Sequence, residues 1–435
     1  MNKFSMFNFI TLNDNNELLL YNSLLGKRSI CKVKNKNIIE NIIKKNIQHI
    51  PLSVIEKMVD RGLIVDKKLN EVKKLYNFLY EVVNPRILHL VINVTEHCNF
   101  RCKYCYEKFS NGEINDEIKD KIINYIKYNI QNYTGLRISW FGGEPLLALN
   151  SINYLSIEFI KICKFHHRSY SADITTNGYL LSKKIFEKLL KLKIHYYQIT
   201  IDGTKKIHDN QRLLLNRQGT FDKIINNLME IKTSKYKNFK ISIRTNFTKE
   251  IFQNMDEYLK LMELFCQNDN RFLISVFKVG KWSDKFDKDL EALLVDNSSN
   301  YMREIYQKIY ESTYKINLNI NFLSPGYGQC YGAKKNSFVI SSKGTLHKCT
   351  ILFENKESIV GEINKNAIYL NDKYYNLISS LNSCKKLAKC FLSPICTGNP
   401  CPYKRKNDNK CVFIKNNLDL ILKIIDKNSE IPCIE

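Results

Sequence analysis

The first region with a regular pattern of apolar and polar positions ends near residue 85. Apolar runs in "NELLLYNSLL" and "KRSICKV" predict two strands, and the spacing in "KNIIENIIKKN" and "PLSVIEKMVDRG" predicts two short helices. A third strand at "GLIVD" and a helix over "KLNEVKKLYNFLYEVV" complete the region. This order of elements predicts a small winged-helix-like unit over residues 1–85.

Between residues 86 and 280, short apolar runs alternate with helical patterns. The β-branched run "ILHLVINVT" predicts a buried strand, and similar runs follow it. The predicted strands cover residues 87–95, 136–143, 172–178, 196–203, 240–248 and 272–279. Helices are predicted between them at residues 116–131, 151–166, 182–192, 220–234 and 254–267. This alternation predicts an α/β fold with a parallel sheet and right-handed crossovers, here a partial (β/α)6 barrel.

The rest of the chain lacks this alternation. Residues 281–324 are polar with helical spacing, which predicts a linker. Residues 325–435 are turn-rich and contain many cysteines, which predicts a small C-terminal unit. We expect this unit to contain little apolar core and to need metal ions or clusters for its stability.

The composition is that of an ordinary globular protein. Hydrophobic residues make up 44% of the 435 residues and charged residues 25%, and this length predicts two or three units. The first residues contain one lysine and an apolar patch, but no cleavage site of a secretory signal follows. No run of residues is expected to reach the length of a membrane span. We therefore expect a cytoplasmic protein without a membrane partner.

The net charge of +24 at first suggests a nucleic-acid-binding protein. The lysines, however, are spread along the whole chain among asparagine and isoleucine and form no basic stripe. We expect a solvated surface and no nucleic-acid partner. The functional alternative is attraction of an acidic partner, such as an acidic peptide.

Fourteen cysteines change this picture. A disulfide framework is not expected in a reducing compartment, where clustered cysteines indicate metal or iron–sulfur sites. Most of the cysteines form an early group and a late group. The four that stand apart are expected to be ordinary residues: Cys31, Cys163, Cys266 and Cys433.

Unusual motifs lie where the predicted strands end. Cys98 follows the first strand, and "GGE", "TNG", "IDG" and "NFT" lie at or after the ends of the next four. Because the carboxyl ends of parallel strands lie on one face of a barrel, we expect these motifs to converge on one site.

The early group, "CNFRCKYCYE", contains Cys98, Cys102 and Cys105 in a CxxxCxxC spacing. A structural zinc ion needs four ligands, commonly in CxxC pairs. Three thiolates can instead hold three irons of a [4Fe–4S] cluster and leave the fourth iron open. The open iron predicts that an exogenous ligand binds there.

This motif, with Tyr104 before its last cysteine, resembles the signature of the radical S-adenosylmethionine (radical SAM) family. The resemblance implies that SAM chelates the open iron and is cleaved to methionine and a 5′-deoxyadenosyl radical, which abstracts hydrogen from the substrate. It also implies an external electron donor, such as a flavodoxin or ferredoxin.

Two further segments resemble cofactor-binding motifs of this family. "FGGEPLL" looks like the GGE motif at the SAM amine, and "ITIDGTKKIHDNQR" is similar to the fourth-strand segment near the SAM ribose and carboxylate. Tyr104 is implied at the adenine. Alone, "GGE" also fits a plain tight turn, and Arg212 also fits a surface or substrate-loop arginine. The implied SAM-binding residues are Tyr104, Gly142, Gly143, Glu144, Asn177, Thr200, Asp202 and Arg212.

The late cysteine group resembles a SPASM domain, which holds one or two auxiliary [4Fe–4S] clusters. Its opening matches CX9–15GX4C, and "CKKLAKCFLSPICTGNPCPYKRKNDNKC" resembles its close, CX2CX5CX3C followed by a later cysteine. Leu387 stands where the first cysteine of CX2C should be, and four residues instead of three separate Cys396 from Cys401. A structural zinc ion held by four cysteines is the alternative. The implied ligands are Cys330, Cys349 and Cys401 for the first auxiliary cluster, and Cys390, Cys396, Cys411 and, in place of Leu387, Cys384 for the second.

The combined resemblance covers about residues 88–411 and implies a radical SAM/SPASM peptide maturase. We expect a ribosomally made precursor peptide as substrate, with its leader held by residues 1–85. The expected product is a thioether or carbon–carbon crosslink at a Cys, Asp, Thr or aromatic side chain. An anaerobic sulfatase-maturating enzyme, which oxidises Cys or Ser to formylglycine, shares the architecture and is the enzyme alternative. A non-catalytic iron–sulfur electron carrier is the alternative of another class, and SAM cleavage would exclude it.

Overall fold

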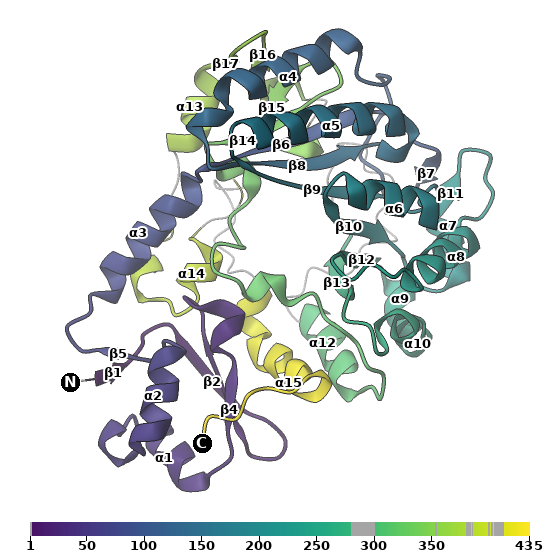
Figure 1. Ribbon diagram of the computed structural model, residues 1–435. Helices are drawn as coiled ribbons and strands as arrows, with labels where there is room; N and C mark the ends of the chain where they lie inside the picture. The colour runs from purple at the N-terminus through teal and green to yellow at the C-terminus, as the bar shows by residue number, and fades with distance from the viewer. Residues whose placement is uncertain are drawn as a thin grey trace.

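The computed structural model describes residues 2–279, 301–352, 355–379, 384, 386–398, 401, 403 and 413–435. Its centre is a ten-stranded sheet in which six neighbouring strands are all parallel, so the predicted (β/α)6 order is confirmed (Figure 1). In spatial order these strands are β13 (Phe272–Lys278), β12 (Lys240–Phe247), β10 (Ile194–Thr200), β9 (Ser169–Thr176), β8 (Gly135–Gly142) and β6 (Ile87–Thr95).

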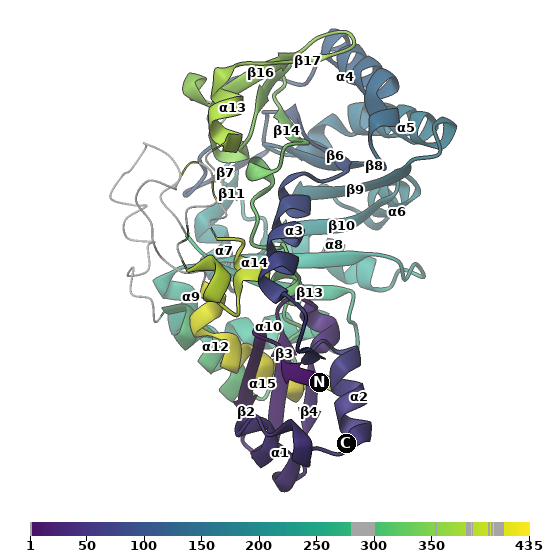
Figure 2. The same cartoon turned by 90° about the vertical axis from the view of Figure 1, so that its left-hand side faces the viewer.

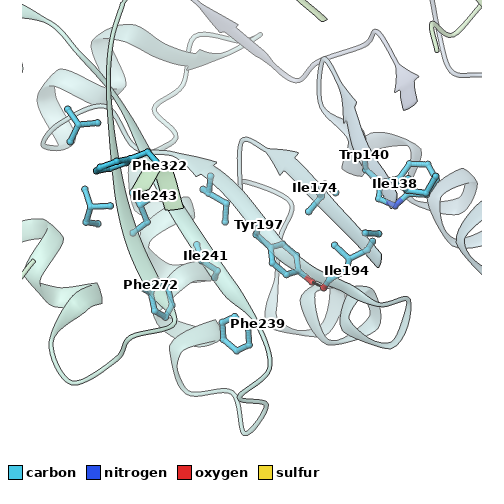
Figure 3. Close-up of a cluster of buried hydrophobic side chains, with 14 of the residues drawn as sticks. Ile138, Trp140, Ile174, Ile194, Tyr197, Phe239, Ile241, Ile243, Phe272 and Phe322 are labelled. Atoms are coloured by element: carbon cyan, nitrogen blue, oxygen red, sulfur yellow. Dashed lines mark hydrogen bonds between the residues drawn. The ribbon is translucent and has the colours of Figure 1, made fainter. Parts of the chain in front are cut away.

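Helices cover the outer face of this curved sheet (Figure 1). The strands turn alternate side chains towards them: on β6, Leu88, Leu90 and Ile92 are fully buried, whereas His89 lies on the opposite face. Figure 3 shows the buried cluster that results, with Trp140 and Tyr197 among its largest side chains. The helices are α4 (Asp116–Asn129), α5 (Leu149–Phe165), α6 (Lys183–Lys191), α7 (Lys205–Gln211), α8 (Phe221–Lys232), α9 (Lys249–Gln253) and α10 (Met255–Cys266).

One expectation about membrane spans is wrong. Within the described part of the chain, the helical stretch Pro145–Phe165 is long and apolar enough to cross a membrane by length and composition alone. It consists of the 3-10 helix η4 (Pro145–Ala148) and α5, and Ile152, Leu155 and Phe159 on it are fully buried in the barrel core. Its buried apolar residues therefore pack against the sheet.

Residues beyond 325 have more apolar core than the sequence predicted. The strand β14 pairs in parallel with the free edge of β6, and three antiparallel strands continue the same sheet. Phe338, Ile340 and Leu346 are buried in the core that the barrel strands also form. These strands are three to five residues long, too short to show a period of two in the sequence. They are β14 (Ser337–Ile340), β15 (Thr345–His347), β16 (Ile359–Ile363) and β17 (Ile368–Leu370).

Residues 2–66 form small sheets with helices at the bottom of Figure 1, coloured purple, and α3 rises from them towards the barrel. A three-stranded antiparallel sheet has the order β2, β3, β4, and β1 pairs separately with β5. The predicted strands and helices are present, whereas β1 and β2 were not predicted. The elements are β1 (Asn2–Phe4), β2 (Asn8–Leu12), β3 (Leu18–Asn22), β4 (Cys31–Val33), α1 (Lys36–Ile43), α2 (Leu52–Asp60), β5 (Ile64–Asp66) and α3 (Glu71–Val83).

The central strand β3 is buried on both faces. Leu18 and Leu20 belong to a core shared with α1 and α2, whereas Leu19 and Tyr21 belong to the main core, which includes α15. The Tyr21 hydroxyl donates to Leu323 O at 2.7 Å. The first and last parts of the described chain are thus packed together (Figure 2). The late helices are α12 (Tyr301–Glu311), α13 (Asp372–Ser379), α14 (Ser393–Cys396) and α15 (Leu418–Asn428).

His89 links three neighbouring strands across the inner face of the sheet. Its Nε2 lies 2.9 Å from Ser139 Oγ on β8, and its Nδ1 lies 3.0 Å from Ser337 Oγ on β14. Burial, with smaller contributions from nearby arginine and lysine charges, lowers the pKa of His89 to about 3. The folded protein therefore keeps this imidazole neutral at pH values where an unfolded chain protonates it.

We expect this difference in pKa to make stability fall in mild acid. The unfolded state binds a proton as the pH drops through about 6.5 and the folded state does not, so the free energy of unfolding decreases below that pH. Between pH 7 and pH 5.5, wild type should lose about 1 kcal/mol more than His89→Gln in urea unfolding. The exposed His49→Gln serves as control and should follow wild type. Equal losses in wild type and His89→Gln would contradict the assignment.

Candidate functional site

The segment that follows β6 is held by strand pairing to a part of the chain that is distant in sequence. β7 (Phe100–Cys102) pairs antiparallel with β11 (Arg212–Leu214), and Cys102 lies opposite Arg212. Cys105 N donates to Cys102 O at 3.1 Å, which closes the turn after β7. The early cysteines are thereby placed beside the residues that follow β10.

Gly142 and Gly143 let the turn after β8 approach the backbone that precedes the cysteines. Gly142 has a φ of +143°, and a Cβ atom there would lie 2.2 Å from Thr95 O. A Cβ atom on Gly143 would lie 2.5 Å from Glu96 O, and Gly143 N donates to Thr95 O at 3.0 Å. The packing of the protein itself therefore requires both glycines.

The Glu144 carboxylate is fully buried and ties this turn to the end of β9. Oε1 accepts hydrogen bonds from Leu146 N at 3.0 Å and from Thr176 Oγ1 at 2.7 Å, and Oε2 accepts from Asn177 N at 2.7 Å. Burial raises the pKa of Glu144, and these hydrogen bonds oppose the rise. Since each carboxylate oxygen has two lone pairs, a further donor can reach only the remaining one on Oε2.

Three of the predicted cofactor-binding residues meet in a largely buried polar network. The Tyr104 hydroxyl donates to Asp202 Oδ2 and accepts from Arg212 Nη1 at 2.6 Å. Asn246, which the sequence analysis did not assign, donates its backbone N–H to Asp202 Oδ1 at 2.8 Å. Burial raises the pKa of Asp202, while the charge of Arg212 lowers it. The "NFT" motif that contains Asn246 was the available signal.

His208 positions the backbone of Arg212 through Thr220. Asp202 N donates to His208 Nδ1 at 3.2 Å, so Nε2 carries the proton and donates to Thr220 Oγ1 at 3.1 Å. The Thr220 hydroxyl in turn donates to Arg212 O at 2.7 Å. Burial, together with the charge of Arg212, lowers the pKa of His208 well below its usual value, which agrees with this neutral tautomer.

Several buried polar atoms beside this network remain free. Asn177 donates its side-chain amide to Asn99 Oδ1 at 2.8 Å, and Thr200 lies at the end of β10. Among the residues that the structure describes, Arg212 Nε and both amide atoms of Asn93 are buried without a hydrogen-bond partner. Buried polar groups are normally paired, so these atoms are available to the polar groups of a ligand.

The three early cysteines lie half-buried at this edge of the sheet. Burial, together with negative charge on neighbouring thiols of the group, raises the pKa of Cys98 and of Cys105 to about 12. Metal coordination reverses this effect, because a bound cation deprotonates a thiol. Three thiols close enough to influence one another's pKa fit three ligands of a [4Fe–4S] cluster.

In the late group, Cys330, Cys349 and Cys401 lie near one another. Burial, together with the charges of Cys330 and Cys401, raises the pKa of Cys349 to about 11. The structure thus brings together the cysteines that the resemblance implied for a first auxiliary cluster. In the described part of the chain, no three Cys, His, Asp or Glu side chains are placed so that they could together hold a single metal ion.

The other late cysteines differ in their exposure. Cys390 and Cys396 are half-buried, Cys384 is exposed, and Cys411 lies outside the described residues. Leu387, at the position where a cysteine was expected, is buried in a small core of the N-terminal region. This packing explains the departure from the pattern, because a leucine here makes apolar contacts. The partners of Leu387 in that core are Phe7, Leu75 and Leu79.

Tyr106, Thr350 and Tyr331 connect the two cysteine groups. Each of them directly follows one of the cysteines described above. Thr350 Oγ1 lies 3.1 Å from the Tyr331 hydroxyl, Thr350 N donates to that hydroxyl at 3.0 Å, and Thr350 also hydrogen-bonds to the side chain of Tyr106. The early and late loops are therefore joined by direct hydrogen bonds.

The inner face of the sheet, opposite the helices, carries polar side chains. Arg137 Nη2 on β8 lies 2.9 Å from Asp173 Oδ2 on β9, and Ser242 Oγ on β12 lies 2.7 Å from Ser275 Oγ on β13. His89 lies on the same face. A closed barrel of this kind fills its interior with branched apolar residues. The inner face of this partial barrel instead carries polar side chains that pair with one another across neighbouring strands.

Comparison with known proteins agrees with this geometry. Residues 92–264 match the family model described as the Radical SAM superfamily. The cysteine-type anaerobic sulfatase-maturating enzyme of Clostridium novyi (strain NT) is 27% identical over 342 residues, which are 71% of this chain and 86% of that protein. The radical SAM cyclopropyl synthase TigE of Paramaledivibacter caminithermalis is 24% identical over 480 residues, covering 96% of this chain and 94% of TigE.

Solved structures share the fold. Native anSMEcpe with bound AdoMet and Kp18Cys peptide has a TM-score of 0.59 and 17% identity, over 78% of this chain and 97% of that one. Streptococcus suis SuiB bound to precursor peptide SuiA has a TM-score of 0.51 and 15% identity, over 92% and 95% of the two chains. Radical SAM enzymes use a [4Fe–4S] cluster and SAM. Residues 92–264 are a radical SAM domain.

Proposed function

We propose that this enzyme modifies a ribosomally made precursor peptide and installs a thioether or carbon–carbon crosslink. The observation that carries the proposal is the cysteine loop at the carboxyl end of β6, which hydrogen bonds of Thr350 to Tyr331 and Tyr106 join to the late cysteine group. Two similar proteins support it: TigE is a cyclopropyl synthase, and SuiB has been solved with a precursor peptide. The leader of the peptide is held by residues 1–85 in this proposal.

The early cysteines, Cys98, Cys102 and Cys105, hold the SAM-binding cluster in this proposal. With SAM bound, that cluster would supply the electron for SAM cleavage, and this radical chemistry would remove a hydrogen atom from the peptide. Arg212 is oriented by Tyr104 and Asp202 and keeps a free Nε for a SAM oxygen. The other residues proposed to contact SAM are Gly142, Gly143, Glu144, Asn177 and Thr200.

The late cysteines hold two auxiliary clusters in this proposal. The charge of Cys401 raises the pKa of Cys330, and the charges of Cys330 and Cys401 raise that of Cys349, which supports the first of them. An outside electron donor, such as a flavodoxin or ferredoxin, reduces the enzyme. The second auxiliary cluster takes Cys390, Cys396, Cys411 and, since Leu387 is a core residue, Cys384.

Co-expression without oxygen tests the function. The enzyme is produced together with short peptides encoded beside its gene, and each peptide is analysed by mass spectrometry. A crosslink removes two hydrogen atoms from the peptide and resists separation of the joined residues in fragmentation. Unchanged peptides, together with SAM cleavage to 5′-deoxyadenosine, would contradict these peptides as substrates.

A second candidate function is favoured by one observation, the 27% identity to a sulfatase-maturating enzyme over 86% of its length. Formylglycine formation exchanges the thiol of a cysteine for an aldehyde oxygen, whereas a crosslink leaves the sulfur in the peptide. The same mass spectra therefore separate the two reactions. An aldehyde that reacts with a hydrazide probe would favour the second candidate.

Glu144→Ala should weaken SAM binding by roughly ten- to a hundredfold, as expected for loss of a charge-assisted contact of about 1.5–3 kcal/mol. Its removal also leaves Leu146 N and Asn177 N without their acceptor, so the turn that holds the cysteine loop loosens. Binding is measured by equilibrium dialysis with labelled SAM. Thr176→Val removes one donor to Glu144 but keeps its charge, and should have a much smaller effect. Unchanged SAM affinity in Glu144→Ala would leave "GGE" as a structural turn only.

A further inference from the structure

Residues 432–435 lie along the outer edge of β4 as an added strand. Lys32 N donates to Pro432 O at 2.9 Å, and Ile434 N donates to Lys32 O at 3.1 Å. Lys32 and Cys433 thereby form a parallel bridge. In Figure 1 the end of the chain accordingly lies beside β4 and α2.

Two side chains hold this segment in a groove. Ile434 is 1% exposed and belongs to the core formed by β3, β4, α1 and α2. The carboxylate of Glu435 accepts hydrogen bonds from Lys34 N at 2.6 Å and from Asn35 N at 2.7 Å. Lys57 Nζ donates to the Glu435 carbonyl at 3.3 Å. The groove therefore fits an extended segment with an apolar residue followed by an acidic one.

The segment is held by few contacts. Pro432, Cys433 and Glu435 are exposed, and their departure leaves α15 and Ile431 in the main core. The gain from one buried isoleucine and a few hydrogen bonds is similar in size to the conformational entropy lost when four residues become ordered. An edge strand that is covered so lightly can exchange one extended segment for another.

We propose that this groove binds the leader of the peptide substrate, and that residues 432–435 occupy it until the leader displaces them. The inference rests on the proposed function and names the surface that recognises the peptide. Addition of a strand to a sheet edge is a general way to bind an extended peptide, with backbone hydrogen bonds for affinity and pockets for specificity. The seated segment defines the partner: a strand parallel to β4 that carries an apolar residue and then an acidic residue.

A chain that stops at Ile431 tests whether the groove is free to bind. The probe is a fluorescein-labelled peptide with the sequence of residues 428–435, "NSEIPCIE". It should bind the shortened chain saturably and the full chain at least tenfold more weakly. A peptide with aspartate in place of the second isoleucine should lose this binding. Equal binding of both peptides would overturn the groove assignment.

The precursor peptide found by co-expression then tests the partner. If residues 432–435 leave the groove open about a tenth of the time, removing them raises the precursor's apparent affinity about tenfold. The labelled 428–435 peptide should be displaced by the precursor from the shortened chain. Ile434→Asp in the full chain releases the segment without shortening the protein and should give the same rise.

The outcomes separate the two proposals. An unchanged precursor affinity in both variants, or simultaneous binding of the precursor and the 428–435 peptide, would overturn this inference. Crosslinked product in the same experiments would still support the proposed function. Both variants should cleave SAM at the wild-type rate when no peptide is present, which shows that the barrel is intact.

Discussion

A variant with Cys98, Cys102 and Cys105 all changed to alanine should produce no 5′-deoxyadenosine from SAM and dithionite in the absence of oxygen. These thiols lie together in and around β7, which pairs with β11. They are the proposed ligands of the SAM-binding cluster. Without them the open iron that binds SAM is lost. The product is measured by chromatography after anaerobic reconstitution.

The iron content of the same variant tests the number of clusters. Three [4Fe–4S] clusters correspond to about twelve irons per chain, and the triple variant should retain about eight. The matched control changes Cys163 and Cys266, which are buried in the main core away from both cysteine groups, and should keep wild-type iron and activity. Turnover near wild type in the triple variant would contradict the assignment, and about four irons with zinc in the wild type would contradict the auxiliary clusters.

Arg212→Met should cost about 3–5 kcal/mol of folding stability, as expected when a buried ion pair loses one partner. Arg212 Nη1 lies 3.8 Å from Asp202 Oδ2, and Asp202 is fully buried. Without the guanidinium, Asp202 stays buried beside Tyr104 and keeps only the weaker compensation from the charge of Arg244. Denaturant unfolding measures the loss, and SAM binding is measured on the same samples.

A second substitution separates stability from function at this site. In Arg212→Met with Asp202→Asn, the unpaired charge is gone and much of the stability should return, whereas SAM affinity should not. Arg303→Met breaks the pair with Asp419, whose side chains are 43% and 32% exposed, and should cost about 1 kcal/mol or less. A loss of similar size in Arg212→Met and Arg303→Met would contradict the buried pairing.

The barrel could be predicted because each strand carries its own signal. "ILHLVINVT" is long, β-branched and apolar, and it forms β6 over the predicted residues. β7 and β11 could not be predicted, since each has three residues and its partner lies far away in sequence. The same reason applies to β14, whose register is set by β6 and not by its own pattern.

In the candidate site, too, some features could be predicted from the sequence and others could not. Spacing alone singled out Cys98 and its two partners, and the position of "GGE" and "IDG" after strands predicted that they lie nearby. The partners of each side chain could not be predicted: the Tyr104 hydroxyl bonds to Asp202 and Arg212, and Asn246 joins them from β12. Such hydrogen bonds depend on atomic distances across several strands, which a single sequence does not encode locally.

The addition of β14 to β6 has a consequence for the order of events during synthesis. Ser337, the partner of His89 on β14, is synthesised late. The edge of the sheet at β6 therefore stays unpaired until most of the chain has left the ribosome. β3 likewise gains the second half of its core only when α15 arrives. Domains usually fold as they emerge, from the N-terminus onward. Here both ends close late, so the late cysteine group can join the early one only after most of the chain has been made.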